Sequence, residues 1–270
     1  MPPRQPLTKE SKEVAMGQNI TIRDESFFKI LRRRHKQQTN AGDTKEYTFY
    51  GQYFPQLDEF LFKRYFPDVN IPGVFVECGA NNGLAASNCK FFEETLHWNG
   101  FNLEPTPETF AMLEKNRPSS CNLQVALSDF CGNIEFGITE CASPNPHYLG
   151  AVNRVLGETT NPDVEKQYPV KKITSVPCIT WTQFVQDNNI AFVDLFILDV
   201  EGHEPQVIRG MKDCPVLPAV MCVENGWRDS IRLELDRLGY AFDIAHFGNH
   251  CYVRKDLLPL FIFRGLHKNC

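Results

Sequence analysis

The sequence lacks the patterns that staple a small fold together or place it in a membrane. Its ten cysteines include no C-x-x-C pair and no Cys/His cluster at zinc-ligand spacing. We therefore expect free thiols in a reducing compartment, with a disulfide framework as the less favoured interpretation. No run reaches the ~18 apolar residues of a membrane span. The N-terminus has no apolar secretory core. These absences predict a soluble, cytoplasmic protein.

The chain also has no internal repeat and no low-complexity tract. With 270 residues, 42% of them hydrophobic and 23% charged, it suits one large α/β domain with additions. Charge is unevenly distributed. Residues 1–45 hold ten Lys and Arg against five Asp and Glu, which leaves 18 basic and 28 acidic residues elsewhere. An acidic body argues against nucleic acid as the main partner.

Residues 1–45 are predicted to form an N-terminal basic arm that precedes the main domain, residues 46–270. Within the arm, Asp24 can cap a helix that continues to about His35 and ends in a basic run. A lid or an anchor on an acidic surface is one interpretation. A solvated end on a docking helix is the favoured one.

Alternating strand and helix patterns from residue 46 predict an α/β fold with a mostly parallel sheet and helices on both faces. After Gly239, two more strands around a turn at Gly248-Asn249-His250 predict an antiparallel hairpin at the sheet edge, and a sheet of seven strands in all. The five other predicted strands are Val74–Cys78, Gly100–Leu103, Leu123–Leu127, Leu195–Leu198 and Ala219–Val223.

Residues 140–172 interrupt this alternation with a stretch rich in Pro, Asn and Gly. Long loops in compact domains are lids, binding loops or disordered segments. We expect this loop to recognise substrate. Tyr148 and Arg154 within it could contact a polyol or sugar, with a plain surface role as the alternative.

Residues 75–83, FVECGANNG, lead an apolar strand into a turn with two glycines. Glycine lets the backbone turn tightly and lets a ligand approach without a Cβ in the way. The G-x-x-x-G spacing is not the dinucleotide fingerprint. Glu77 would repel a pyrophosphate and attract the α-ammonium of S-adenosylmethionine (SAM), which favours SAM over NAD. The predicted cofactor contacts in this segment are Glu77, Gly79, Asn81 and Gly83.

Two further segments offer cofactor contacts. Glu104 ends the next strand and can accept hydrogen bonds from both ribose hydroxyls, although a carboxylate that only caps the loop is the alternative. Ser128 and Asp129 follow the third strand, where they could bond the adenine edge. A plain Asx turn is the alternative for this pair.

Five stretches together carry a more specific likeness: FVECGANNG, SNCKFFEETLHWNGFNLEP, EKNRP…ALSD, VPCITW and FILDVEGHEPQVIRGM. On these, in this order across residues 74–226, the sequence resembles the FkbM-type family of SAM-dependent methyltransferases. It departs from the family at Glu77 and Asn82, where Asp is frequent, and at Tyr53, where Asp often follows the Gln. The resemblance implies a class I, Rossmann-like methyltransferase fold. It also implies methyl transfer to a hydroxyl of a small molecule, such as a sugar or a polyketide-like natural product.

The chemistry is expected at the ends of the last two parallel strands. An alcohol needs a base before it can accept a methyl group, and His203 is the predicted base, with Asp199 as its catalytic neighbour. A helix-capping or substrate-orienting histidine is the alternative. Asp199, Glu224 and Asn225 are hard oxygen ligands on adjacent strand ends. By analogy with metal-dependent O-methyltransferases they predict a Mg²⁺ or Mn²⁺ site.

Several alternatives stay open at this point. The oxygen ligands could instead bond the substrate or the SAM ammonium without a metal, and Glu201 is expected to point away and tie down its turn. A non-catalytic SAM-binding protein, a protein methyltransferase and an NAD-dependent oxidoreductase are the rival functions.

Overall fold

The computed structural model describes residues 47–84, 86–139, 152–157 and 166–258. The predicted basic arm, 1–45, with its helix from Asp24, lies outside these residues, as does most of the 140–172 loop. No helix within the described ranges is long and apolar enough to cross a membrane.

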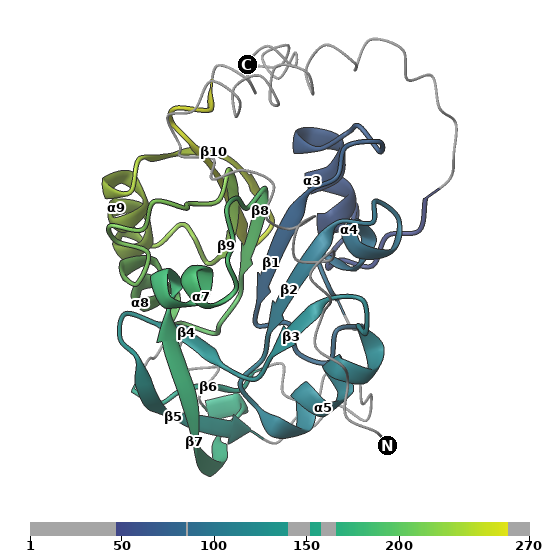
Figure 1. The fold of residues 1–270 in the computed structure, drawn as a ribbon. Helices are drawn as coiled ribbons and strands as arrows, with labels where there is room; N and C mark the ends of the chain where they lie inside the picture. The colour runs from purple at the N-terminus through teal and green to yellow at the C-terminus, as the bar shows by residue number, and fades with distance from the viewer. Residues whose placement is uncertain (1–46, 85, 140–151, 158–165, 259–270) are drawn as a thin grey trace.

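A seven-stranded sheet forms the centre of the molecule (Figure 1). Its strand order is β10-β11-β9-β8-β1-β2-β3, with only β11 antiparallel to its neighbours. The predicted mostly parallel sheet with an antiparallel edge hairpin is therefore confirmed. The chain order reverses between β1 and β8, the place where open α/β sheets bind ligands. The strands are β1 (Val74–Cys78), β2 (Asn99–Leu103), β3 (Cys121–Leu123), β8 (Leu195–Leu198), β9 (Val220–Glu224), β10 (Tyr240–His246) and β11 (Asn249–Arg254).

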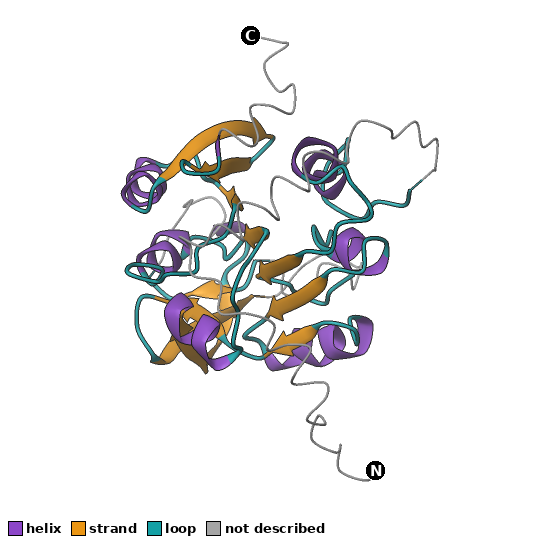
Figure 2. Cartoon of the chain, turned by 45° about the horizontal axis from the view of Figure 1, so that its top comes forward, coloured by secondary structure: helices purple, strands orange, loops and turns teal. Residues whose placement is uncertain are grey.

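Helices cover both faces of this sheet, as predicted (Figure 2). Side chains alternate between the two faces along each strand. Phe75 and Leu195 therefore join the apolar cluster that includes α3 and α4, while Val76 and Phe196 join the cluster that includes α7, α8 and α9. Strands buried on both faces read as continuous apolar runs. The helices are α3 (Leu57–Tyr65), α4 (Lys90–Glu94) and α5 (Pro107–Asn116) on one side, and α7 (Trp181–Asp187), α8 (Glu204–Arg209) and α9 (Asp229–Arg237) on the other.

A second, four-stranded sheet was not predicted. It contains β4 (Ala126–Ser128), β5 (Gly132–Thr139), β6 (Arg154–Val155) and β7 (Val170–Thr180), in the order β4-β7-β5-β6. The single strand predicted at Leu123–Leu127 was wrong, because Leu123 pairs with Leu103 in the large sheet whereas Ala126 pairs with Cys178 in the small one. The two residues between them carry the chain from one sheet to the other.

Two other boundaries differ from the prediction. β6 and the start of β7 lie within residues 140–172, so this segment is not loop throughout. The β10–β11 turn consists of Phe247 and Gly248, because Asn249 already pairs with His246. Phe247 takes a positive φ of 53°, as two-residue hairpin turns of the mirror-image types require.

Candidate active site

A cavity of about 1120 Å³, counted out to its open mouth, lies at the carboxyl ends of β1, β2, β8 and β9. Glu77–Asn81, Glu104, Asp199–Glu201 and Glu224 line it from the strand ends. Phe136 and Val155 of the small sheet close another side. The cavity therefore sits where the chain order of the large sheet reverses, and the small sheet turns an open crevice into a walled site.

Gly79 brings two strand ends into backbone contact. Its φ is +87°, and a Cβ built on it would lie 1.8 Å from the carbonyl oxygen of Asp199. The N–H groups of Gly79 and Ala80 both donate to the carbonyl of Leu103, at 3.1 Å. No residue with a side chain fits here. The prediction that glycine serves the turn at this position thus has a physical cause, which is the packing of β1 against the turn after β8.

The other two predicted residues of this turn, Asn81 and Gly83, have different surroundings: Asn81 faces the cavity, whereas Gly83 packs against the end of α5. Asn81 lines the cavity with a φ of 47°, and its Oδ1 is buried without a hydrogen-bond partner among the described residues. Gly83 is not among the described lining residues. A Cβ on Gly83 would lie 2.6 Å from Cγ of Arg117, so its missing side chain makes room for α5.

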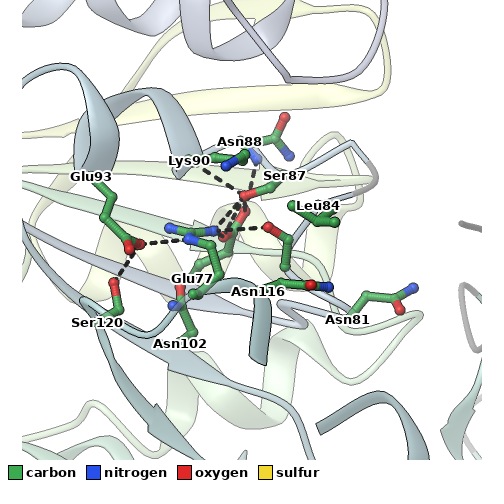
Figure 3. A network of polar contacts seen from close by, with 12 residues as sticks. Glu77, Asn81, Leu84, Ser87, Asn88, Lys90, Glu93, Asn102, Asn116 and Ser120 are labelled. Atoms are coloured by element: carbon green, nitrogen blue, oxygen red, sulfur yellow. Dashed lines mark hydrogen bonds and ion pairs between the residues drawn. The ribbon is translucent and has the colours of Figure 1, made fainter. Parts of the chain in front are cut away.

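Glu77 lines the cavity, and its carboxylate already accepts hydrogen bonds from within the protein (Figure 3). Ser87 Oγ donates to it at 2.9 Å, the N–H of Asn88 at 2.8 Å, and Arg117 Nη1 at 3.3 Å. Burial raises the pKa of Glu77, and the charge of Arg117 opposes that rise. The predicted ammonium ligand therefore already has a cationic partner.

Glu104 is anchored and still faces the cavity. Its Oε1 accepts the N–H of Thr106 at 2.9 Å, the Thr109 hydroxyl at 2.8 Å and the Thr106 hydroxyl. Its Oε2 accepts the N–H of Asn81 at 3.1 Å and keeps a further lone pair. Burial raises the pKa of Glu104, and these donors oppose the rise. The capping role is thus real, and it leaves one oxygen able to accept a ligand hydroxyl.

Ser128 and Asp129 do not face the cavity as predicted contacts would. Ser128 Oγ lies 3.0 Å from Nε2 of His203, and Asp129 accepts Nε of Arg209 at 3.1 Å. Neither is among the described lining residues. The preceding stretch, residues 125–127, supplies an apolar wall instead.

His203 stands directly before α8, lines the cavity and is only 3% exposed. Burial lowers its pKa to about 4. The imidazole is therefore neutral at physiological pH, and Ser128 fixes the orientation of its ring.

Three carboxylates meet at the β8 and β9 ends of the cavity. Ligand oxygens of Asp199, Glu201 and Glu224 all lie within 4.8 Å of one another. Burial, and then the charge of Glu224, raise the pKa of Asp199 well above its usual value, and Asp199 and Glu224 share a hydrogen bond. Burial and Glu224 raise the pKa of Glu201 to about 8. In the absence of a cation this cluster must hold protons.

The membership of this cluster differs from the prediction. Glu201 was expected to point away, yet it takes a positive φ of 54° and joins the other two acids. Asn225 is instead tied to the hairpin turn, because its N–H donates to the carbonyl of Gly248 at 2.9 Å. It is not among the lining residues that the structure describes. Asp199 and Glu224 are brought together as predicted, with Glu201 as the third acid.

Aromatic side chains stand beside the acids. Tyr53 is 43% exposed and stacks on Phe247, with 4.5 Å between ring centroids and 12° between ring planes. Burial, followed by the charges of Glu224 and Asp199, raises the pKa of Tyr53. Its neighbour Gln52 lines the cavity. In the sequence Tyr53 is distinguished only as a departure from the family pattern, and no local pattern points to its partner, 194 positions further along.

Of the two loop residues predicted to recognise substrate, Tyr148 lies outside the described residues. Arg154 is buried and donates to the carbonyls of Val152 and Tyr168, each at 3.2 Å. Its charge also lowers the pKa of Glu201, against the larger effect of burial. Arg154 thus holds β6 beside the acids.

The fold and the comparisons with known proteins together identify the family of this chain. A seven-stranded sheet whose chain order reverses between β1 and β8, with β11 antiparallel and a cavity at the reversal, defines a class I methyltransferase fold. The Methyltransferase FkbM domain matches residues 77–242, more than half of the sequence. The chain therefore belongs to the FkbM methyltransferase family. No curated protein matches the sequence.

Solved structures also resemble the chain, at low identity. The methyltransferase FkbM from Methylobacillus flagellatus KT is 12% identical, with a TM-score of 0.41, and the match covers 68% of this chain and 44% of that one. The chain thus spans less than half the length of that protein. A ribosomal protein L11 methylase from Lactobacillus delbrueckii subsp. bulgaricus is 9% identical, with a TM-score of 0.38 and coverages of 74% and 78%. Family membership rests on the domain match, not on these likenesses.

Proposed function

We propose that this protein transfers a methyl group from SAM to a hydroxyl of a small molecule. One observation carries the proposal. A single cavity has an anchored carboxylate, Glu104, at the end of β2 and a cluster of three acids at the ends of β8 and β9, in a chain of a methyltransferase family. Glu104 can accept hydrogen bonds from ribose hydroxyls. The three acids can bind an acceptor hydroxyl that must lose its proton.

In this proposal three strand ends would contact the cofactor. Glu104 Oε2 would accept a ribose hydroxyl, and the methionine part would lie along the turn of Gly79 and Asn81, whose free Oδ1 can accept a donor. The adenine would lie against the apolar wall at 125–127, while Ser128 and Asp129, the predicted polar contacts, bond His203 and Arg209 instead. An acid close to the G-x-x-x-G turn disfavours a pyrophosphate, which argues against NAD.

The reaction is an in-line displacement. The acceptor oxygen forms a bond to the methyl carbon while the bond from that carbon to the sulfonium sulfur breaks, which leaves S-adenosylhomocysteine (SAH). The hydroxyl proton must go to a base in the site. His203 is neutral and lines the cavity, so it can accept the proton, and Asp199 would orient the hydroxyl. A base with a lowered pKa is weak, so most of the rate would come from positioning and from the already activated methyl group.

The acids also fit a hard divalent cation. Asp199, Glu201 and Glu224 offer only oxygen ligands, and Glu224 Oε2 is buried without a hydrogen-bond partner among the described residues. These three residues would hold Mg²⁺ or Mn²⁺, with Asn225 outside the set. When bound, the ion would lower the pKa of a hydroxyl that contacts it.

The acceptor would approach past Tyr53 and Phe247. Their exposed rings offer a flat apolar surface, and the described cavity lining contains no Lys or Arg that could pair with an anionic acceptor. This combination favours an uncharged ring-bearing alcohol over a phosphorylated or carboxylated one.

The test is methyl transfer from radiolabelled SAM to a panel of sugars and hydroxylated natural products, matched with phosphorylated sugars. We expect labelled product from at least one uncharged member and none from its phosphate. SAM binding without turnover of any member, including protein substrates in a second panel, would make the chain a non-catalytic SAM-binding protein. Label on a protein alone would make it a protein methyltransferase.

A further inference from the structure

A fully buried arginine lies directly behind the glycine-rich turn. Arg117 follows the last residue of α5 and is 0% exposed. Removing a guanidinium from water costs several kcal/mol unless it is paired and hydrogen-bonded. Arg117 Nε donates to Glu93 at 2.5 Å, and Nη1 donates to Ser87 at 2.8 Å and to Glu77 at 3.3 Å. Because the buried guanidinium of Arg117 is bonded to Glu77, which lines the cavity, we expect it to have a role in the site.

The same end of α5 grips the turn itself. Arg117 Nη1 reaches the carbonyl of Gly83 at 3.4 Å, and Asn116 Nδ2 donates to the carbonyl of Asn82 at 2.8 Å. The Cγ of Arg117 occupies the space that a side chain on Gly83 would need. The turn is therefore held by the last residue of α5 and by the residue that follows it.

Glu77 is the link between this network and the cavity. Its carboxylate has about four lone-pair directions. Donors from Ser87, Asn88 and Arg117 already occupy it, and Figure 3 shows the contacts of the labelled Ser87 and Asn88. A cofactor ammonium would have to compete with the buried guanidinium for this carboxylate.

We infer that Glu77 and Arg117 are positioning residues for the cofactor site, and that Glu77 does not bind the cofactor ammonium. The pair holds the turn so that the N–H of Asn81 meets Glu104 at 3.1 Å. In this way the ion pair sets the position of the carboxylate proposed to bind ribose. The inference rests on the proposed function only in that the ligand is SAM or SAH.

Two ligands separate positioning from direct contact. SAH carries the α-ammonium, and 5′-methylthioadenosine has the same adenosine without it. We expect Glu77→Gln and Arg117→Lys to weaken both ligands by the same factor, about tenfold, in titration calorimetry at a temperature where each variant is folded. The matched control is Glu114→Gln on the exposed face of α5, which should leave both affinities unchanged.

Each other outcome is decisive. Weaker SAH binding with unchanged methylthioadenosine binding in Glu77→Gln would show a direct ammonium contact and overturn the inference. If Arg117→Lys has a lower melting temperature but binds both ligands with wild-type affinity, the arginine is merely structural and the inference is wrong. The Arg117→Lys variant also keeps the inference testable if Glu77→Gln does not fold. Wild-type protein that binds neither ligand would instead refute the proposed function itself.

Discussion

The Cβ that Gly79 lacks would lie 1.8 Å from the carbonyl oxygen of Asp199. The turn proposed to hold the cofactor and the strand end that carries the acid cluster are therefore in direct backbone contact. A displacement of one must move the other. In the proposed reaction this contact would help to set the distance between the methyl donor and its acceptor.

Replacing Gly79 with alanine should abolish that contact. Gly79 and Gly239 have almost the same φ, +87° and +85°, but a Cβ on Gly239 would meet nothing within 4 Å. Gly239→Ala should cost about 1 kcal/mol for its backbone conformation alone. Gly79→Ala adds a steric overlap with backbone and should cost more than about 4 kcal/mol in urea unfolding. Equal losses in the two variants would show that the close approach is absent.

His203 should make stability depend on pH. Burial lowers its pKa from 6.5 to about 4, so the unfolded chain takes up a proton before the folded one. The stabilisation is complete above pH 6.5 and is lost as the pH falls to about 4. The difference amounts to about 3 kcal/mol. Chemical unfolding should show wild type losing about that much more than His203→Gln over this range. If the free energy of unfolding fell equally with pH in the two proteins, His203 would be charged in the folded protein over this range, which contradicts the prediction.

Tyr53 should act on the acceptor and not on the cofactor. Tyr53→Ala removes the ring stacked on Phe247 beside the acids and should raise the acceptor KM about tenfold, with SAH affinity unchanged. Phe242 is the matched control, because it is 50% exposed on β10 and lines a separate surface groove. Phe242→Ala should change neither quantity. A loss of SAH affinity in Tyr53→Ala would move this residue to the cofactor side.

Removal of divalent ions should lower turnover. If Asp199, Glu201 and Glu224 hold a cation, treatment with EDTA should reduce kcat more than about tenfold and leave SAH affinity intact, since Glu104 lies on another strand. Added Mg²⁺ or Mn²⁺ should restore the rate. Full activity in EDTA would leave the acids as direct hydrogen-bond partners of the acceptor hydroxyl.

The parallel strands and the edge hairpin could be predicted because short, mainly apolar runs alternate with helical patterns and with turns that carry glycine. Val74–Cys78 and Leu195–Leu198 have the predicted bounds. The second sheet could not be predicted in this way. Most residues of β7 are exposed or only partly buried, and Lys171 and Lys172 interrupt its apolar pattern. Its pairing with β5 joins segments far apart in sequence, which no local pattern reports.

The meeting of Asp199 and Glu224 could be predicted because the carboxyl ends of parallel strands lie at one edge of the sheet. The position of Glu201 was not, since a single positive φ turned it toward the cavity. Arg117 gave no signal at all. It looked like the basic end of a helix, and only the fold brings Glu77 and Glu93 to it from 40 and 24 positions away.

The most direct test of the central claim is calorimetric titration of SAH into the wild type and into Glu104→Gln. We predict micromolar binding to the wild type and at least about tenfold weaker binding to the variant, because the ribose loses its charged hydrogen-bond acceptor. Wild-type protein that binds neither SAH nor SAM would contradict the account.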